Sequence, residues 1–341
     1  MIKYLLQNNT EIKLILFIFY IHKMIGVCEM TKKIIMDCDP GHDDAIALIL
    51  AGAKYSTLDI LAVTTVAGNQ AVEKNTKNAL NVLEVMGRRD IEVSVGASRP
   101  LIKPASFASE IHGDSGLDGP KLPEVPSLKP TQYHAADVII KTLKQSADPV
   151  TIVATGPLTN VATALIKDPS IAQSIDSITI MGGGTFGNWT PTAEFNIWVD
   201  AEAAKRVFES GININVFGLD VTHQVLATDE VIQRFNSIDN KISQFVVELL
   251  EFFKSTYKTH FNMDGGPIHD ACTILYLLQP DLFTMQQTHI DIEHQSSLTY
   301  GTMSVDLYNV TNKEKNAYFA TAVDVERVWT LMEHMLKSYN V

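Results

Sequence analysis

Residues 33–51 read KIIMDCDPGHDDAIALILA and place an apolar strand, a short acidic turn and an apolar helix in direct succession. The apolar run 34–36 is typical of a buried strand, and Pro40-Gly41 favours a turn. From Asp43 onward the chain reads as an apolar helix with an acidic first turn, where the helix dipole favours negative charge. A strand that leads through a tight turn into a helix is the unit from which α/β sheets are built.

The turn carries more negative charge than a helix terminus needs. Its carboxylates, all within residues 37–44, are Asp37, Asp39, Asp43 and Asp44. Asp37 and Asp39 lie two apart at the end of the strand and therefore point the same way. Crowded carboxylates repel one another unless a cation neutralises them, and an all-oxygen set suits a hard ion such as Ca²⁺ or Mg²⁺. A cation site is therefore favoured over a solvated loop that merely caps the helix.

The composition describes an acidic protein with a sizeable core. Its 341 residues are 46% hydrophobic, and 39 acidic against 27 basic residues give a net charge of −12. An acidic chain without basic runs argues against nucleic acid and anionic membranes as partners. Cys28, Cys38 and Cys272 are too few and too scattered for a disulfide framework or a thiolate metal site. We therefore expect a soluble enzyme of the reducing cytoplasm.

The first 29 residues differ from the rest of the chain. Residues 14–21 are a continuous apolar run, too short to span a bilayer. The run resembles the apolar part of a signal peptide, although no clean cleavage site follows it. Met30 stands directly before the first strand. We predict that translation begins at Met30, that residues 1–29 are a non-core extension, and that residues 30–341 form one domain.

Beyond residue 32, β-rich runs alternate with helical patterns. This alternation predicts a single α/β domain with a mostly parallel central sheet and helices on both faces. Ligands bind beyond the carboxyl ends of the strands in such sheets, so the polar loops there are expected to converge on one site. Residues 97–130 are predicted to form a long loop, and residues 284–311 an antiparallel excursion of short strands. The expected strands are 33–38, 58–66, 91–95, 150–154, 177–181 and 214–217, and the expected helices are 43–53, 70–86, 132–146, 158–167, 200–208, 228–235, 240–258, 269–278 and 322–338.

Five further segments carry polar residues where a simple core would not need them. Glu194 and Asn196 lie two apart, and such side chains suit sugar hydroxyls, which both donate and accept. His269 and Asp270 begin an apolar helix, where capping is the alternative role. His112 lies in the long loop, and a plain loop residue is its simpler interpretation. The five segments are 111–114, 151–160, 181–184, 187–196 and 266–271.

Taken together, these segments resemble those of the inosine-uridine nucleoside hydrolase family. The run Asp-x-Asp-Pro-Gly-x-Asp-Asp at 37–44 is the family hallmark, and Ala-Thr-Gly-Pro-Leu-Thr-Asn, Met-Gly-Gly-Gly, Ala-Glu-Phe-Asn and Pro-Ile-His-Asp-Ala follow in the family's order. The resemblance covers the chain from residue 32 to the last helix. It implies a Rossmann-like nucleoside hydrolase fold and a homodimer or homotetramer. It also implies Ca²⁺-dependent hydrolysis of the N-glycosidic bond of ribonucleosides to free base and ribose, in nucleoside salvage.

The resemblance also implies roles for individual residues. Asp39, Asp44, Asp270 and the backbone carbonyl of Thr155 resemble the family's Ca²⁺ ligands, and Asp39 also resembles its general base. His269 is the expected proton donor to the leaving base. The expected substrate contacts are Asp43 and Asn196 on the ribose 2′- and 3′-hydroxyls, Asn188 and Glu194 on the 5′-hydroxyl, and Asn69, His112, Met181, Phe195, Phe253 and Tyr257 around the pocket.

His269 also bears on which base is cleaved. The family's purine-specific branch has Trp at the matching position, so His269 favours the branch that cleaves inosine and uridine. A pyrimidine-specific ribonucleoside hydrolase is the alternative. Phe253 and Tyr257 lie one turn apart on the preceding helix, where they either line the base pocket or pack in the core.

Two other classes of protein share part of this pattern. An aspartate-nucleophile phosphohydrolase also places Asp-x-Asp after its first strand, but it continues with a small hydroxyl residue where this chain has Pro40-Gly41-His42. A non-catalytic Ca²⁺-dependent binder of nucleosides or sugars would keep Asp44 and Asp270 but could lose Asp39 or His269. This chain has both residues, and the hydrolase is therefore favoured.

Overall fold

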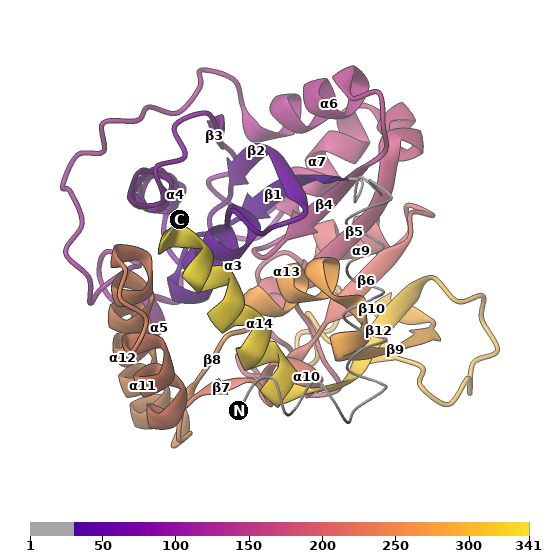
Figure 1. Ribbon diagram of the computed structural model, residues 1–341. Coiled ribbons are helices and arrows are strands. Elements are labelled where there is room, and N and C mark those ends of the chain that lie inside the picture. Colours follow the sequence, from indigo (N-terminus) through magenta and orange to yellow (C-terminus); the bar gives the residue numbers. More distant parts are fainter. Residues whose placement is uncertain (1–30, 341) are drawn as a thin grey trace, which may run out of the picture. The chain divides into compact units, whose positions relative to one another are not determined.

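A central eight-stranded sheet organises residues 31–340, the part of the chain that the computed structural model describes (Figure 1). The strand order is β3-β2-β1-β4-β5-β6-β12-β9, and every neighbouring pair is parallel except β12 with β9. The predicted single α/β fold with a mostly parallel sheet is confirmed. The strands of this sheet are β1 (Lys32–Cys38), β2 (Leu58–Thr65), β3 (Val93–Val95), β4 (Val150–Ala154), β5 (Ile175–Met181), β6 (Ile214–Phe217), β9 (Phe283–Thr288) and β12 (Ala317–Val323).

Helices cover both faces of the sheet, and each face has its own core. Ile34 and Met36 of β1 pack into one core, whereas Ile35 packs into the other, as the alternation of side chains along a strand requires. The helices are α3 (His42–Ala51), α4 (Val72–Met86), α5 (Ser109–His112), α6 (Ala135–Gln145), α7 (Thr159–Lys167), α8 (Phe195–Val199), α9 (Ala201–Phe208), α10 (Leu219–Thr222), α11 (Asp229–Asn236), α12 (Lys241–Phe261), α13 (Ala271–Leu278) and α14 (Val325–Lys337). Helices α3, α4 and α11 to α14 contribute to the first core, and α6, α7 and α9 to the second.

The strand order reverses between β1 and β4. From β1 the sheet grows through β2 and β3 to one edge, and from β4 through β5 and β6 towards the other. The two strands end side by side, and the Thr155 N–H donates to the Asp37 carbonyl at 2.9 Å. Because the chain leaves β1 and β4 in opposite directions, a crevice opens beyond their carboxyl ends. This reversal places the acidic turn next to the turn after β4.

The C-terminal part of the sheet differs from the prediction. Residues 317–323 form β12, which had no counterpart among the expected strands, and the helix predicted from residue 322 begins at Val325. The expected antiparallel excursion is present as the pair β10 (Ile290–Ile292) and β11 (Met303–Val305), but β9 belongs to the main sheet. The short helices α5, α8 and α10 were also not expected. Each has at most five residues, too few for a helical period to show in sequence.

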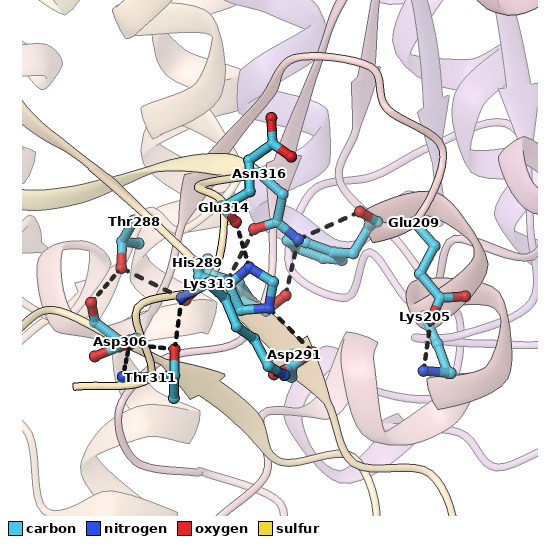
Figure 2. Close-up of polar contacts among 12 residues, drawn as sticks. Lys205, Glu209, Thr288, His289, Asp291, Asp306, Thr311, Lys313, Glu314 and Asn316 are labelled. Carbon is cyan, nitrogen blue, oxygen red and sulfur yellow. Dashed lines mark hydrogen bonds and ion pairs between the residues drawn. The ribbon is translucent and has the colours of Figure 1, made fainter. Parts of the chain in front are cut away.

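A polar network anchors the antiparallel excursion at the amino ends of β6 and β12 (Figure 2). The His289 Nδ1 lies 2.6 Å from the Glu314 carbonyl, and the Lys313 ammonium contacts the Asp291 carboxylate at 2.6 Å. The Asn316 side chain accepts from the Ile290 N–H and donates to the Ile290 carbonyl. These contacts lie at the edge of the sheet opposite to the carboxyl ends, so they stabilise the fold away from the crevice.

Two expectations about the N-terminus concern residues that the structure does not describe. The predicted start of translation at Met30 and the predicted extension 1–29 both lie outside the described residues. Within residues 31–340, no helix is both long enough and apolar enough to cross a bilayer. Residues 97–130 are irregular except for α5, as the loop prediction requires.

Candidate active site

A cavity of about 750 Å³ opens beyond the carboxyl ends of β1, β4 and β5. Its walls combine apolar and polar side chains, and no Lys or Arg is among them. Asp39 and Asp44 do not line the cavity but are fully buried beside it. All other expected site residues do line it, namely Asp43, Asn69, His112, Thr155, Met181, Asn188, Glu194, Phe195, Asn196, Phe253, Tyr257, His269 and Asp270.

A cluster of buried carboxylates forms one end of this cavity. Oxygens of Asp43, Asp44 and Asp270 lie within 4.8 Å of one another. Burial raises the pKa of all three carboxyls, and that of Asp43 rises to about 8. Repulsion from neighbouring carboxylates adds to the effect at Asp43 and Asp270. Buried carboxylates that repel one another are unfavourable in free energy unless a cation lies near them. The cluster is therefore a candidate metal site.

Asp39 lies next to the cluster but is not one of its three members. One of its oxygens accepts from the Asn69 N–H at 2.7 Å, while Oδ1 is buried without a partner. Its pKa is raised well above the usual value, first by burial and then by the charge of Asp44. A Cβ on Gly68 or Gly156 would lie 2.1 Å or 2.5 Å from its carboxylate oxygens. The two glycines therefore make the room in which this carboxylate sits.

Asp44 is held in one orientation by donors from three segments. Its Oδ2 accepts from the Gly41 N–H at 3.0 Å and from the Asn69 side chain at 3.3 Å. Its Oδ1 accepts from the Thr155 hydroxyl at 2.7 Å and from the Asp39 N–H at 3.3 Å. Because the acidic turn supplies two of these donors, residues 39–44 fold around the carboxylate that they contain.

Asn196 links the turn after β4 to the end of β5. Its Nδ2 donates to the Thr155 carbonyl at 2.8 Å and to the Met181 carbonyl at 3.2 Å. The side-chain amide is therefore oriented with its nitrogen towards the protein, and its oxygen remains as an acceptor. The Thr155 carbonyl, expected as a metal ligand, keeps a second lone pair for that purpose.

Glu194 has a structural role that the sequence did not indicate. As the N-cap of α8 it accepts from the Asn196 N–H at 3.0 Å and the Ile197 N–H at 3.2 Å, and it also accepts from the Gly183 N–H at 2.8 Å. Burial raises its pKa to about 7, although these N–H donors oppose the shift. Asn188 likewise accepts from the Phe195 N–H at 3.1 Å. Both side chains line the cavity while they shape its wall.

His269, the residue before Asp270, lines the cavity and lies between two hydroxyl groups. The Thr222 hydroxyl is 2.7 Å from its Nδ1, and the Tyr257 hydroxyl is 2.8 Å from its Nε2. Burial lowers the pKa of His269 well below its usual value, so the ring is neutral near pH 7. Phe253 packs edge-on against Tyr257 with ring centroids 4.8 Å apart. Phe253 and Tyr257 are thus buried aromatics that also face the cavity.

Sequence reasoning missed two residues of this region. Thr222 at the end of α10 contacts His269 across 47 residues of chain, and no local pattern marks it. His42 belongs to the acidic turn itself, yet it had no assigned role. Its ring is fully buried and lies against that of His112, with centroids 5.5 Å apart. His42 stands beside the acidic first turn of this helix, where a polar residue is ordinary, so its type gave no separate signal.

Comparison with known proteins identifies relatives along the whole described domain. The sequence model of the family described as inosine-uridine preferring nucleoside hydrolase matches residues 34–330. A protein named pyrimidine-specific ribonucleoside hydrolase RihA from Shewanella baltica (strain OS185) is 48% identical over 313 residues, which cover 91% of this chain and 98% of that protein. Its namesake from Escherichia coli O7:K1 is 46% identical over 312 residues, which cover 91% and 100%.

Solved structures of nucleoside hydrolases share the fold. The plant nucleoside hydrolase PpNRh1 superposes with a TM-score of 0.84 at 33% identity, over 90% of this chain and 99% of its own. A purine-preferring ribonucleoside hydrolase from Gardnerella vaginalis superposes with a TM-score of 0.82 at 29% identity, over 90% and 99%. This chain therefore resembles both a structure named purine-preferring and relatives named pyrimidine-specific, so the fold alone does not select the base.

Proposed function

The chain belongs to the inosine-uridine preferring nucleoside hydrolase family, and from that premise we propose that it is a Ca²⁺-dependent hydrolase of pyrimidine ribonucleosides. Ribonucleoside hydrolysis follows from the family match and from relatives at 46–48% identity. The pyrimidine preference rests on the names of those relatives, which agree with the alternative base preference considered from the sequence and not with the first. The main structural support for metal-dependent catalysis is the buried carboxylate cluster at one end of the cavity.

The donor atoms around the cluster fit Ca²⁺. Asp43, Asp44 and Asp270 bring oxygens together, and the Asp39 Oδ1 is buried without a partner beside them. An all-oxygen set without nitrogen or sulfur suits this ion. We propose that Asp39, Asp44, Asp270 and the Thr155 carbonyl hold it and that Asp43 faces the ribose. When bound, the ion supplies positive charge that lowers the pKa of water and attracts the ribose hydroxyls.

The remaining groups position the sugar and take up a proton. Asp39 is the proposed general base, because its Oδ1 has no protein partner among the described residues and is free to accept a proton. Asn196 has its amide nitrogen engaged with the protein, so its oxygen is free to accept from a ribose hydroxyl. Cleavage of an N-ribosidic bond develops positive charge on the ring. The anionic end of the cavity, with Asp43 at its surface, stabilises that charge.

The departing base needs a proton, and two side chains that line the cavity can supply it. The hydroxyl of Tyr257 and the neutral imidazole of His269 form a hydrogen-bonded pair that lines the cavity. Thr222 holds the far nitrogen of the imidazole and thereby orients the ring. We propose that this pair delivers the proton and that Thr222 is a positioning residue.

Replacing His269 by Ala is expected to slow the hydrolysis of uridine about 100-fold, because general acid catalysis contributes on that order. Hydrolysis of p-nitrophenyl riboside should fall less than about threefold, since its leaving group departs without a proton. His260→Ala is the matched control, because His260 also lines the cavity, whereas the hydrogen bond of the Tyr257 hydroxyl goes to His269. Equal losses on the two substrates would show that His269 only supports the metal site.

The base preference is tested by ribose release from uridine, cytidine, inosine and adenosine. Uridine and cytidine should exceed both purine nucleosides in kcat/KM by at least about tenfold. Uridine 5′-monophosphate should react at least about 100-fold more slowly than uridine, because the cavity wall offers its phosphate no Lys or Arg and contains buried carboxylates. Faster ribose release from inosine than from the pyrimidine nucleosides would instead indicate the base preference of the inosine–uridine branch. Release from no nucleoside would favour a binding protein.

The remaining expectations are proposals of the same kind. The resemblance to the family supports a homo-oligomer that acts in nucleoside salvage. Cys38 and Cys272 are buried free thiols, and the acidic composition lacks basic runs. Both observations support the proposed place of this enzyme in a reducing cytoplasm.

A further inference from the structure

His42 is a buried polar residue of the acidic turn that the mechanism above does not use. It is the first residue of α3, and its side chain is fully buried next to the carboxylate cluster. Its ring stacks on Phe252, with centroids 5.0 Å apart and planes 4° apart, and on Phe253, with centroids 5.3 Å apart and planes 9° apart. Two aromatic neighbours and the helix start hold this ring in a fixed plane.

The chain dictates which nitrogen of His42 carries the proton. Its Nε2 lies 2.8 Å from the backbone carbonyl oxygen of Asp118, in the long loop. A carbonyl oxygen only accepts, so the Nε2 must donate and therefore bears the hydrogen. In a neutral ring the Nδ1 is then an acceptor. The carbonyl of Asp118, which lies 76 residues further along the chain, thus fixes the tautomer of His42.

The acceptor nitrogen of His42 faces His112. The two Nδ1 atoms lie 3.3 Å apart, and the ring of His112 lines the cavity. A Cβ on Gly41 would lie 2.4 Å from the His112 Nδ1, so only a glycine allows this approach. The His42 N–H also lies 3.4 Å from the same nitrogen. The His112 Nδ1 cannot accept a hydrogen bond from the His42 backbone N–H while it donates one to the His42 ring. If it did not donate to the ring, its lone pair would face the lone pair of the His42 Nδ1 across only 3.3 Å.

We propose that His42 is a positioning residue that fixes the ring and the tautomer of His112. His112 donates from its Nδ1 to His42, and its Nε2, which has no protein partner among the described residues, becomes an acceptor in the cavity. That acceptor takes a hydrogen bond from the edge of the pyrimidine base, from the N3–H of uracil or the 4-amino group of cytosine. This inference rests on the proposed function and names the group that recognises the base.

The kinetic test compares His42→Leu with His42→Asn on three substrates at saturating Ca²⁺. His42→Leu should lower kcat/KM for uridine about tenfold and leave p-nitrophenyl riboside, which has no base N–H, within about twofold. His42→Asn should lose less, because its amide oxygen can accept from His112. Wild-type enzyme should lose about tenfold on N3-methyluridine, and His42→Leu should add nothing to that loss.

A double variant shows whether His42 acts through His112. His42→Leu combined with His112→Ala should be no slower on uridine than His112→Ala alone. Equal losses on uridine and p-nitrophenyl riboside would overturn the proposal, because they would mean that His42 only supports the metal-binding turn. Unchanged uridine kinetics would overturn it as well.

Nitrogen NMR of ¹⁵N-histidine-labelled protein tests the tautomer without turnover. In the wild-type protein His112 should show a protonated Nδ1 and a bare Nε2, and His42→Leu should abolish that preference. A protonated Nε2 in the wild-type protein would contradict the proposal. The wild-type rates on uridine and cytidine test the proposed function by themselves, so its failure is distinguishable from a failure of the His42 inference.

Discussion

Replacing Asp39 by Asn is expected to lower kcat for uridine about 1,000-fold and to leave the fold intact, because a lost general base typically costs a factor of this order. Asn has the shape of Asp and can still accept from the Asn69 N–H in the space left by Gly68 and Gly156. It cannot take a proton from water. The measurement is steady-state ribose release at saturating Ca²⁺, with circular dichroism and Tm as checks on the fold.

Asp37→Asn is the matched control for this variant. Asp37 lies two residues earlier, is equally buried and accepts from the Asn160 side chain at 2.8 Å, but it is neither a proposed metal ligand nor the proposed base. Its replacement should leave kcat within about threefold, because Asn can keep that contact. A near-normal kcat in Asp39→Asn would rule out Asp39 as the base. Equal losses in both variants would point to general damage of the turn.

Removing the metal is expected to abolish activity and to lower Tm by roughly 5 °C, if the ion is present at about 100 times its Kd. The physical reason is the mutual repulsion of Asp43, Asp44 and Asp270 once nothing neutralises them. The measurement is thermal unfolding with and without a strong Ca²⁺ chelator. An unchanged Tm and an unchanged activity would show that no ion bound at the cluster contributes to stability or to catalysis.

The loss of stability on chelation should depend on pH. In the metal-free protein burial raises the pKa of Asp43 to about 8 from the usual 3.8. Since the unfolded chain ionises this group more readily, the metal-free protein loses stability as the pH rises from about 4 to about 8. The Tm difference caused by the chelator should therefore be larger at pH 8 than at pH 5.5. A larger Tm difference at pH 5.5 than at pH 8 would contradict this prediction.

Much of the fold could be read from the sequence because its strands are buried on both faces. Strands β1, β2 and β4 to β6 are apolar runs bounded by polar turns, and their predicted positions agree with the structure to within a few residues. β12 was missed because residues 317–323 run directly into α14 without a turn signal. Its place between β6 and β9 depends on pairing between distant segments, which no local pattern contains.

The site residues that lie in dense polar motifs could be predicted, whereas those defined by distance could not. Asp43, Asp44 and Asp270 are unusual for their positions next to apolar runs, and the structure brings them together. Thr222 contacts His269 across 47 residues, and the Asp118 carbonyl contacts His42 across 76 residues. The local sequence around Thr222 and Asp118 therefore does not indicate these contacts. Glu194 was identified by type, but its capping of α8 required a helix too short to predict.

Ca²⁺-dependent cleavage of pyrimidine ribonucleosides can be tested by returning metal ions to the metal-free protein. Protein starting at Met30 is stripped with a chelator and dialysed, and ribose release from uridine is followed as Ca²⁺ is returned, with Mg²⁺ in a parallel series. We expect no release from the stripped protein, recovery with Ca²⁺ and little recovery with Mg²⁺, which prefers an octahedral site. Full release from the stripped protein would contradict the claim, and so would recovery with Mg²⁺ alone.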